Sequence, residues 1–358
     1  MIYAKITSGI IMPFTAKDTQ CMALALQLSA KARHTVNANP MVGCVIARGG
    51  EIIAQDYHRE YGKNHAEVKA LAHIDGKAKG ATLYVTLEPC SHHGKTPPCT
   101  DAVIASGATK VIIATLDPNP LVSGRGVQLL ELAGIEVEIG LLENEAKALN
   151  RGFIKRMQTG LPFVTSKIAM SLDGKTAMAS GESKWITSEA ARVDVHKLRR
   201  GSQAIVTGSG TVLKDNPSLT ARLPEVSVTP LRVIIDSNNQ ITDKNLKVFS
   251  DDAQTLVINR DNCDSSVNGK VDLKAALLKL GELGINTVLI EAGPGLNGAL
   301  QQDGLIDELV IYTAPVLFGS DATSMMQLPI TTMGDKVTLK IHDCRQIGVD
   351  MKITASFK

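Results

Sequence analysis

The sequence has little of what marks several classes of protein. Aromatic residues make up 3% of its 358 residues, and its six cysteines are spread along the chain. Such dispersed cysteines exclude a small disulfide-stapled scaffold. No apolar stretch approaches the roughly 18 residues that span a bilayer, so no membrane segment is expected. The formal net charge is only +2, and no block of five or more like charges occurs, which argues against broad binding to nucleic acid or a membrane surface.

The N-terminus also lacks the features of a secretory signal. Its short apolar run has no basic segment before it, is not continuous, and is not followed by a small-residue cleavage site. We therefore interpret residues 1–17 as a tail. The cytoplasm is the expected compartment, and thiols there stay free to bind a metal.

What is present describes a globular protein of two domains. Hydrophobic residues make up 44% and charged residues 21% of a chain long enough for two domains. Predicted strands alternate with predicted helices, which indicates the α/β class. The pattern restarts near residues 155–162, so we expect one domain over residues 18–160 and a second over 161–358.

The first predicted domain begins with a helix over 19–33, with Asp18 as its N-cap. Two strands around a Gly49-Gly50 turn follow it. Further helices are predicted at 65–74, 99–107, 124–134 and 144–158, and strands at 81–90, 110–117 and 135–140. In the second domain, strands are predicted at 162–174, 203–210, 231–237, 254–260, 286–293, 307–319 and 352–358, and helices at 188–201, 271–284 and 296–304.

The segment from residue 64 to 99 carries the first candidate site. It contains His65, Glu67, Cys90 and Cys99. Zinc prefers imidazole and thiolate ligands in a tetrahedron, and a catalytic site keeps the fourth position for water. We therefore expect His65, Cys90 and Cys99 to hold one zinc ion that acidifies a water. Glu67 would move the proton, because the first turn of a helix lets it and His65 reach the same place.

The spacing departs from the short form of the zinc-deaminase signature, H-x-E followed by P-C-x-x-C. Here the second cysteine lies nine residues after the first, and the intervening segment carries His92 and His93. Either histidine could compete as a ligand. A closed structural zinc site and a site without any metal are the remaining interpretations of these side chains.

The second domain carries a weaker signal. Gly293, Gly295 and Gly298 form a G-x-G-x-x-G sequence after a predicted strand and at the start of a predicted helix, where backbone amides could hold a phosphate. The motif comes late in the domain instead of on its first strand. A Rossmann fold is therefore not the favoured interpretation.

Several stretches together resemble the bifunctional riboflavin-biosynthesis deaminase/reductase family. They are ANPMVGCVI, HAEV, VTLEPCSHHGKTPPCTDAVI, DPNPLVSGRG, SLDGKTAMASGESKWIT and IEAGPGLNGAL, and the match runs from about Asp18 to the C-terminus. The long insert between the cysteines is that family's own form of the zinc motif. The resemblance implies a cytidine-deaminase-like N-terminal domain and a dihydrofolate-reductase-like C-terminal domain.

The resemblance also implies two successive reactions. The first is the zinc-dependent hydrolytic deamination of 2,5-diamino-6-ribosylamino-4(3H)-pyrimidinone 5′-phosphate. The second is the NADPH-dependent reduction of the ribosyl group, which gives 5-amino-6-ribitylamino-2,4(1H,3H)-pyrimidinedione 5′-phosphate. The partner would be this small molecule and neither nucleic acid nor membrane, and a homo-oligomer, favoured as a dimer, is expected.

Positions in the second domain carry over from matching motifs of the family. The residues that would face NADPH are Ala169, Trp185, Thr211, Asp215, Ser237, Gly293, Pro294, Gly295, Leu296, Asn297, Gly298 and Ala299. The residues that would face the substrate are Ser183, Arg199, Leu219, Arg222 and Glu291. Arginine suits a ribose phosphate because its guanidinium offers a fork of donors.

Two questions stay open at this point. The reduction needs a proton, and Lys167, Asp215 and Glu291 are the ionisable candidates, which the sequence does not rank. Besides the bifunctional enzyme, the sequence leaves room for a deaminase of a base in RNA or DNA and for a non-enzymatic zinc-binding scaffold. The near-neutral charge and the scarcity of aromatic residues offer a nucleic-acid deaminase no evident binding surface.

Overall fold

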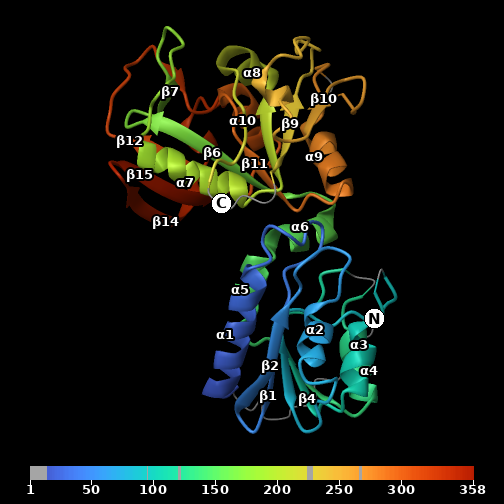
Figure 1. The fold of residues 1–358 in the computed structure, drawn as a ribbon. Helices are drawn as coiled ribbons and strands as arrows, with labels where there is room; N and C mark the ends of the chain where they lie inside the picture. Colours follow the sequence, from blue (N-terminus) through green and yellow to red (C-terminus); the bar gives the residue numbers. More distant parts are fainter. Residues whose placement is uncertain (1–13, 95, 120–121, 224–228, 266–267) are drawn as a thin grey trace. The chain divides into compact units, whose positions relative to one another are not determined.

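The computed structural model describes residues 14–94, 96–119, 122–223, 229–265 and 268–358 (Figure 1). Residues 1–13 of the predicted tail lie outside the described residues. Contacts divide the chain into two units between Asn150 and Arg151, and residues 37–39 group with the second unit. The boundary expected from the sequence, after residue 160, lies beyond the helix at 151–159, which groups with the second unit. Among the described residues, no helix combines the length and the apolar character needed to cross a membrane.

The first unit is built on a five-stranded sheet in the order β2-β1-β3-β4-β5. Strand β1 pairs antiparallel with β2 and β3, whereas β3, β4 and β5 run parallel. Gly49 and Gly50 have positive φ and make the predicted turn between β1 and β2. The strands are β1 (Gly43–Arg48), β2 (Glu51–Tyr57), β3 (Thr82–Val85), β4 (Lys110–Ile113) and β5 (Glu136–Ile139).

Helices cover both faces of this sheet, with α1 on one side and α2 and α3 on the other (Figure 1). The first five residues of β1 are all buried, as a strand covered on both faces requires. Helix α1 lies so close that a Cβ at Gly43 would be 2.0 Å from the carbonyl oxygen of Ala25. The helices are α1 (Ala16–Ala30), α2 (Ala66–Ala72), α3 (Cys99–Ala105), α4 (Arg125–Leu132) and α5 (Glu143–Leu149).

The start of α1 corrects the sequence prediction. The N-cap is Thr15, not Asp18. The Thr15 hydroxyl accepts from the Asp18 amide at 3.1 Å, and the Asp18 carboxylate accepts from the Thr15 amide at 2.9 Å. This reciprocal capping box satisfies two backbone donors at the helix end, and Asp18 therefore sits inside the helix as its third residue.

The helix predicted over 144–158 is two helices, α5 and α6 (Arg151–Thr159). Asn150 interrupts it. Its side-chain amide accepts from the Met41 backbone N–H at 2.8 Å and donates to the Met41 carbonyl at 2.9 Å. This pairing with a distant segment could not be foreseen from helical periodicity.

The second unit contains an eight-stranded sheet in the order β10-β9-β8-β11-β6-β12-β15-β14. The strands from β10 to β12 run parallel, and β15 and β14 add an antiparallel edge. The strands are β6 (Phe163–Ser171), β8 (Ala204–Gly208), β9 (Leu231–Ile235), β10 (Thr255–Ile258), β11 (Thr287–Ile290), β12 (Glu308–Ala314), β14 (Leu339–Ile347) and β15 (Asp350–Phe357). Strands β7 (Lys175–Ala177) and β13 (Thr323–Ser324) form a separate pair.

Buried aliphatic residues of the parallel strands form the main core of the second unit, with Val206, Val233 and Ile290 among its members. Helix α9 adds Leu277 and Leu280 to this core. The helices after α6 are α7 (Glu189–Arg200), α8 (Ser209–Asp215), α9 (Leu273–Glu282) and α10 (Pro294–Gln302). Strand β14 was not predicted, because it is a largely exposed edge strand without a buried apolar run.

Candidate functional sites

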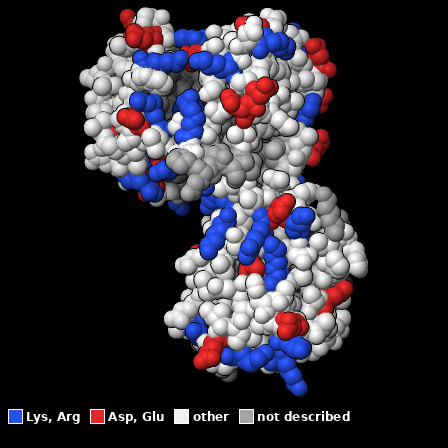
Figure 2. Space-filling view, in the orientation of Figure 1, with Lys and Arg blue, Asp and Glu red and all other residues white. Residues whose placement is uncertain are grey.

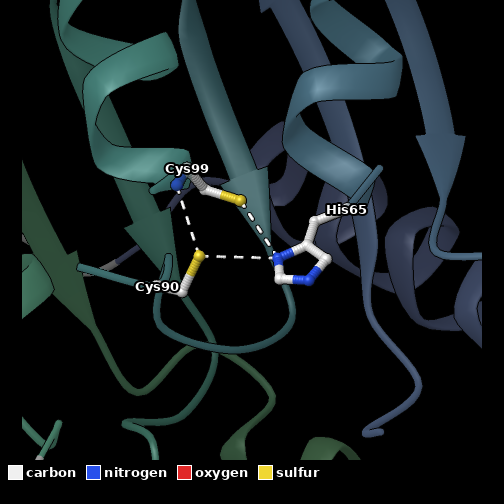
Figure 3. A group of neighbouring side chains, drawn as sticks. All are labelled: His65, Cys90 and Cys99. Atoms are coloured by element: carbon white, nitrogen blue, oxygen red, sulfur yellow. Dashed lines mark hydrogen bonds between the residues drawn. The ribbon is translucent and has the colours of Figure 1, made fainter. Parts of the chain in front are cut away.

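Three predicted zinc ligands converge in the first unit (Figure 3). The Nδ1 atom of His65 lies 3.5 Å from Sγ of Cys90 and 3.2 Å from Sγ of Cys99. The ligand atoms of these three residues all lie within 4.8 Å of one another. Among the described residues, this is the one group of three or more His, Cys, Asp or Glu side chains with such spacing.

The first turns of two helices position these side chains. His65 is the N-cap of α2, and Glu67 is in the first turn of that helix, as predicted. Pro98 precedes α3, which begins at Cys99. The backbone N–H of Cys99 donates to Sγ of Cys90 at 3.3 Å. The turn geometry inferred from the sequence is therefore the geometry that brings the ligands together.

The donor set fits zinc. Zinc–sulfur bonds of about 2.3 Å and zinc–nitrogen bonds of about 2.0 Å give a nitrogen–sulfur edge of about 3.5 Å in a tetrahedron. The two distances from His65 Nδ1 are close to that edge. A second observation also fits a metal-bound water at this site: Oε2 of Glu67 is buried and has no hydrogen-bond partner in the structure. A buried carboxylate oxygen needs a donor, and a water at the metal would be one.

The protonation of the site follows from burial and from hydrogen bonds between its members. Desolvation raises the pKa of Glu67 to about 7. The hydrogen bond from the Cys99 thiol lowers the pKa of Cys90, whereas that bond and burial raise the pKa of Cys99. A carboxyl group whose pKa lies near neutral pH can both take up and release a proton there.

The competing histidine ligands are not part of the cluster. His92 and His93 are both exposed, and neither belongs to the three-residue group. A different histidine, His58, lies against the site, with its ring 5.1 Å from that of His65. His58 is 2% exposed, and burial lowers its pKa, which favours the neutral ring.

The second unit contains a cavity of about 1780 Å³ at the carboxyl ends of its parallel strands. All the residues that the resemblance assigned to NADPH and the substrate line this cavity, except Gly298. Gly298 faces the chain at Gln327, where a Cβ would be 2.1 Å from a carbonyl oxygen. Its role is therefore close packing of α10, while Gly293 and Gly295 lie at the cavity.

A buried cluster of charges lies in this cavity. Arg199 donates to Glu291 from Nε at 2.5 Å and from a terminal nitrogen at 3.0 Å. The Nζ atom of Lys167 lies 3.2 Å from Oε2 of Glu291. Burial opposes ionisation of Glu291, but the nearby charges of Lys167 and Arg199 prevail and lower its pKa to about 2. Glu291 is therefore ionised at neutral pH.

The G-x-G-x-x-G segment has the predicted setting. It follows β11, and α10 begins at Pro294 with Gly293 as its N-cap. Asn297 fixes this junction, because its side chain accepts from the Ser166 hydroxyl at 2.8 Å and donates to the Ala292 carbonyl at 2.9 Å. The amides at the start of α10 therefore face the cavity on a rigid support.

Two basic residues near Trp185 were not predicted from the sequence. Trp185 is 71% exposed, and the guanidinium of Arg192 stacks over its ring at 4.7 Å. Lys184 also lines the cavity and donates to the Asp215 carbonyl at 3.0 Å. Sequence patterns predicted neither Arg192 nor Lys184 at this site. A basic residue beside the sole tryptophan was the available signal for Lys184.

Comparison with known proteins identifies a family for each unit. Residues 15–115 match the cytidine and deoxycytidylate deaminase zinc-binding region, and residues 162–353 match the RibD C-terminal domain. The riboflavin biosynthesis protein RibD of Escherichia coli K12 is 45% identical over 94% of this chain and 98% of its own length. The protein of the same name from Haemophilus influenzae is 44% identical over 96% of this chain and 98% of its own length.

Solved structures agree over nearly the whole chain. A structure of Acinetobacter baumannii RibD superposes with a TM-score of 0.89, at 41% identity, covering 96% of this chain and 99% of its own. A Thermotoga maritima diaminohydroxyphosphoribosylaminopyrimidine deaminase/5-amino-6-(5-phosphoribosylamino)uracil reductase superposes with a TM-score of 0.86, at 36% identity, covering 96% and 99%. The predicted fold classes, cytidine-deaminase-like and dihydrofolate-reductase-like, are confirmed. This chain belongs to the RibD family of bifunctional deaminase/reductases of riboflavin biosynthesis.

Proposed function

We propose that His65, Cys90 and Cys99 hold the zinc of the deaminase, and that Glu67 is its proton-transferring residue. The substrate of this half is 2,5-diamino-6-ribosylamino-4(3H)-pyrimidinone 5′-phosphate, whose amino group leaves as ammonia. One observation carries the proposal: a buried carboxylate with a partnerless oxygen lies beside three ligands of the type and spacing that zinc selects.

Each residue of the deaminase site has a separate task. The three ligands would hold zinc, which would supply Lewis-acid activation of water. Glu67 receives the proton of the attacking water and passes it to the leaving amine, which its pKa of about 7 permits at neutral pH. His65 is fixed as a ligand by its place at the start of α2.

We propose that the reductase uses the whole cavity of the second unit. NADPH bound there would supply the hydride for the ribosyl group. The amides at the start of α10, with Gly293 and Gly295, receive the cofactor's phosphates, because a helix N-terminus favours negative charge. The other proposed NADPH contacts along this cavity are Ala169, Trp185, Thr211, Asp215, Ser237, Pro294, Leu296, Asn297 and Ala299.

The substrate end of the cavity lies at the charge cluster. Ser183, Leu219 and Arg222 line the cavity together with Arg199 and Glu291. We assign the proton of the reduction to the Lys167–Glu291 pair in preference to Asp215. The two side chains lie 3.2 Å apart, so the ammonium of Lys167 can supply a proton while Glu291 holds it in place.

The remaining expectations extend this proposal. The partner is a small molecule, in keeping with the interspersed basic and acidic side chains on the visible face of each unit (Figure 2). Six free cysteines are consistent with a reducing cytoplasm as the compartment. A homodimer is the proposed assembly. The molar mass measured by light scattering during size-exclusion chromatography tests it directly.

Product analysis tests the two reactions together. The purified chain is incubated with the diaminopyrimidine ribose phosphate, with and without NADPH. Release of ammonia without NADPH, followed by a gain of two hydrogens in its presence, supports the proposal. Oxidation of NADPH without any deamination contradicts the assigned order. Single-stranded RNA and DNA serve as competing substrates, and deamination of either would favour a nucleic-acid deaminase.

A further inference from the structure

Glu88 lies two residues before the proposed zinc ligand Cys90 and is 3% exposed. Its carboxylate accepts four backbone N–H groups from one segment of the chain. Oε2 accepts from Asp117 at 3.1 Å and from Gly124 at 3.0 Å. Oε1 accepts from Gly126 at 2.8 Å and from Val127 at 3.3 Å. The segment that contains these donors includes the stretch DPNPLVSGRG, one of those that resemble the family.

The carboxylate completes the start of helix α4. The N-cap of that helix is Gly124, which has no side chain to accept from the first-turn amides. Glu88 supplies the missing acceptor from another part of the chain and also places negative charge at the helix N-terminus. The contact is close, because a Cβ at Gly126 would be 2.3 Å from the Pro89 carbonyl oxygen.

The anchoring continues to Cys90. The backbone N–H of Glu88 donates to the Thr115 carbonyl at 3.0 Å, so main chain and side chain are both held. Pro89 is the one residue between Glu88 and the ligand, and its ring restricts the backbone angle φ at that position. On the far side, the Cys90 carbonyl accepts from the backbone N–H of Thr100 at 3.2 Å. Cys90 is thus held between an anchor at α4 and the start of α3.

We propose that Glu88 is a positioning residue for the zinc site, which fixes Cys90 where His65 and Cys99 meet it. The inference rests on the proposed zinc site. A carboxylate is required because both oxygens act only as acceptors, each with two donors. An amide in its place would turn an NH₂ group toward two backbone N–H groups and release the anchor.

The test compares Glu88→Gln with Glu131→Gln, an exposed position on the same helix α4. The full chain is purified with zinc, and the dissociation constant for zinc is measured by competition with a chromophoric chelator. Loss of a residue that orients a metal ligand typically weakens metal binding by 10–100-fold. We expect at least about a 10-fold increase for Glu88→Gln and no change for Glu131→Gln. The reductase activity of the same preparations reports the integrity of the second unit.

The outcomes separate this inference from the proposed function. If the wild-type protein binds no zinc, both the proposed zinc site and the role of Glu88 are wrong. Equal zinc affinity in wild type and Glu88→Gln overturns the role of Glu88 and leaves the zinc site intact. If Glu88→Gln does not fold, Glu88→Asp keeps both acceptors on a shorter side chain and is judged by the same affinity measurement. Deamination by Glu88→Gln should recover in part when zinc is added in excess, because a weakened site fills again at higher zinc concentration.

Discussion

Arg199 and Glu291 are joined by two hydrogen bonds, of 2.5 and 3.0 Å, inside the cavity of the second unit. The pair links the end of α7 to the residue that follows β11. It also fixes the charge of Glu291, which faces Lys167 on its other side. The cavity therefore contains a buried anion held by two cations.

Removal of Arg199 should damage the reductase alone. In Arg199→Met the buried carboxylate keeps only Lys167, and the proposed substrate contact is lost. We expect kcat/KM for the reduction to fall about 100-fold, because loss of one partner of a buried, hydrogen-bonded charge contact weakens binding by about 2–5 kcal/mol. Arg200→Met, outside the cavity, is the control. Normal reduction by Arg199→Met would contradict the assignment, and ammonia release should be unchanged in both variants.

The acid stability of the second unit should depend on Glu291. Its pKa of about 2 lies below the usual 4.5, so the folded state binds fewer protons than the unfolded state. The stabilisation is complete above pH 4.5 and is lost as the pH falls from about 4.5 toward 2, by at most about 3 kcal/mol. The fluorescence of Trp185, the sole tryptophan, reports the unfolding. The Glu291→Gln variant should show a weaker dependence on pH in this range, and an unchanged dependence would be evidence against the ionised carboxylate.

Two glycines of one motif should respond differently to alanine. A Cβ at Gly298 would be 2.1 Å from the Gln327 carbonyl oxygen, whereas at Gly295 the nearest atom is the Gln327 side-chain oxygen at 3.4 Å. Gly298→Ala should therefore destabilise the second unit, by roughly 1–3 kcal/mol as overpacking usually does. Gly295→Ala should fold normally and raise the KM for NADPH. Equal thermal stability of the two variants would be inconsistent with this difference in packing.

Removal of the metal should separate the two reactions. Dialysis against a chelator is expected to abolish ammonia release, because the proposed ligands all lie in the first unit. Oxidation of NADPH with the already deaminated intermediate should continue at its original rate. Restored zinc should restore ammonia release. Parallel loss of both activities would place a metal in the reductase step, against the proposal.

The sequence predicted most of what local chemistry determines. The H-x-E spacing indicated the zinc cluster because His65 and Glu67 share the first turn of α2. The glycines at 49 and 50 indicated the turn of the first hairpin, because few other residues adopt positive φ so readily. The cavity residues came from the resemblance, because they lie on strand β6, on helices α7, α8 and α10 and on the loops between these elements, which no local sequence pattern connects.

What the sequence did not predict depends on long-range contacts. Asn150 divides a helix by pairing with Met41, which is 109 residues away. Glu88 stood out only as part of a motif, because its four donors come from a segment that begins about 30 residues later. The cap of α1 was misplaced because Asp18 and Thr15 are both good cap residues, and only the structure shows their reciprocal bonds.

Glu67→Gln gives the most direct test of the central claim, which is that Glu67 moves the proton at a zinc site formed by His65, Cys90 and Cys99. The measurement is zinc content and ammonia release on the same purified sample. The account predicts one zinc per chain, as in the wild type, with ammonia release reduced by at least about 100-fold, the contribution of a general acid-base. Ammonia release at the wild-type rate from zinc-loaded Glu67→Gln protein would contradict it.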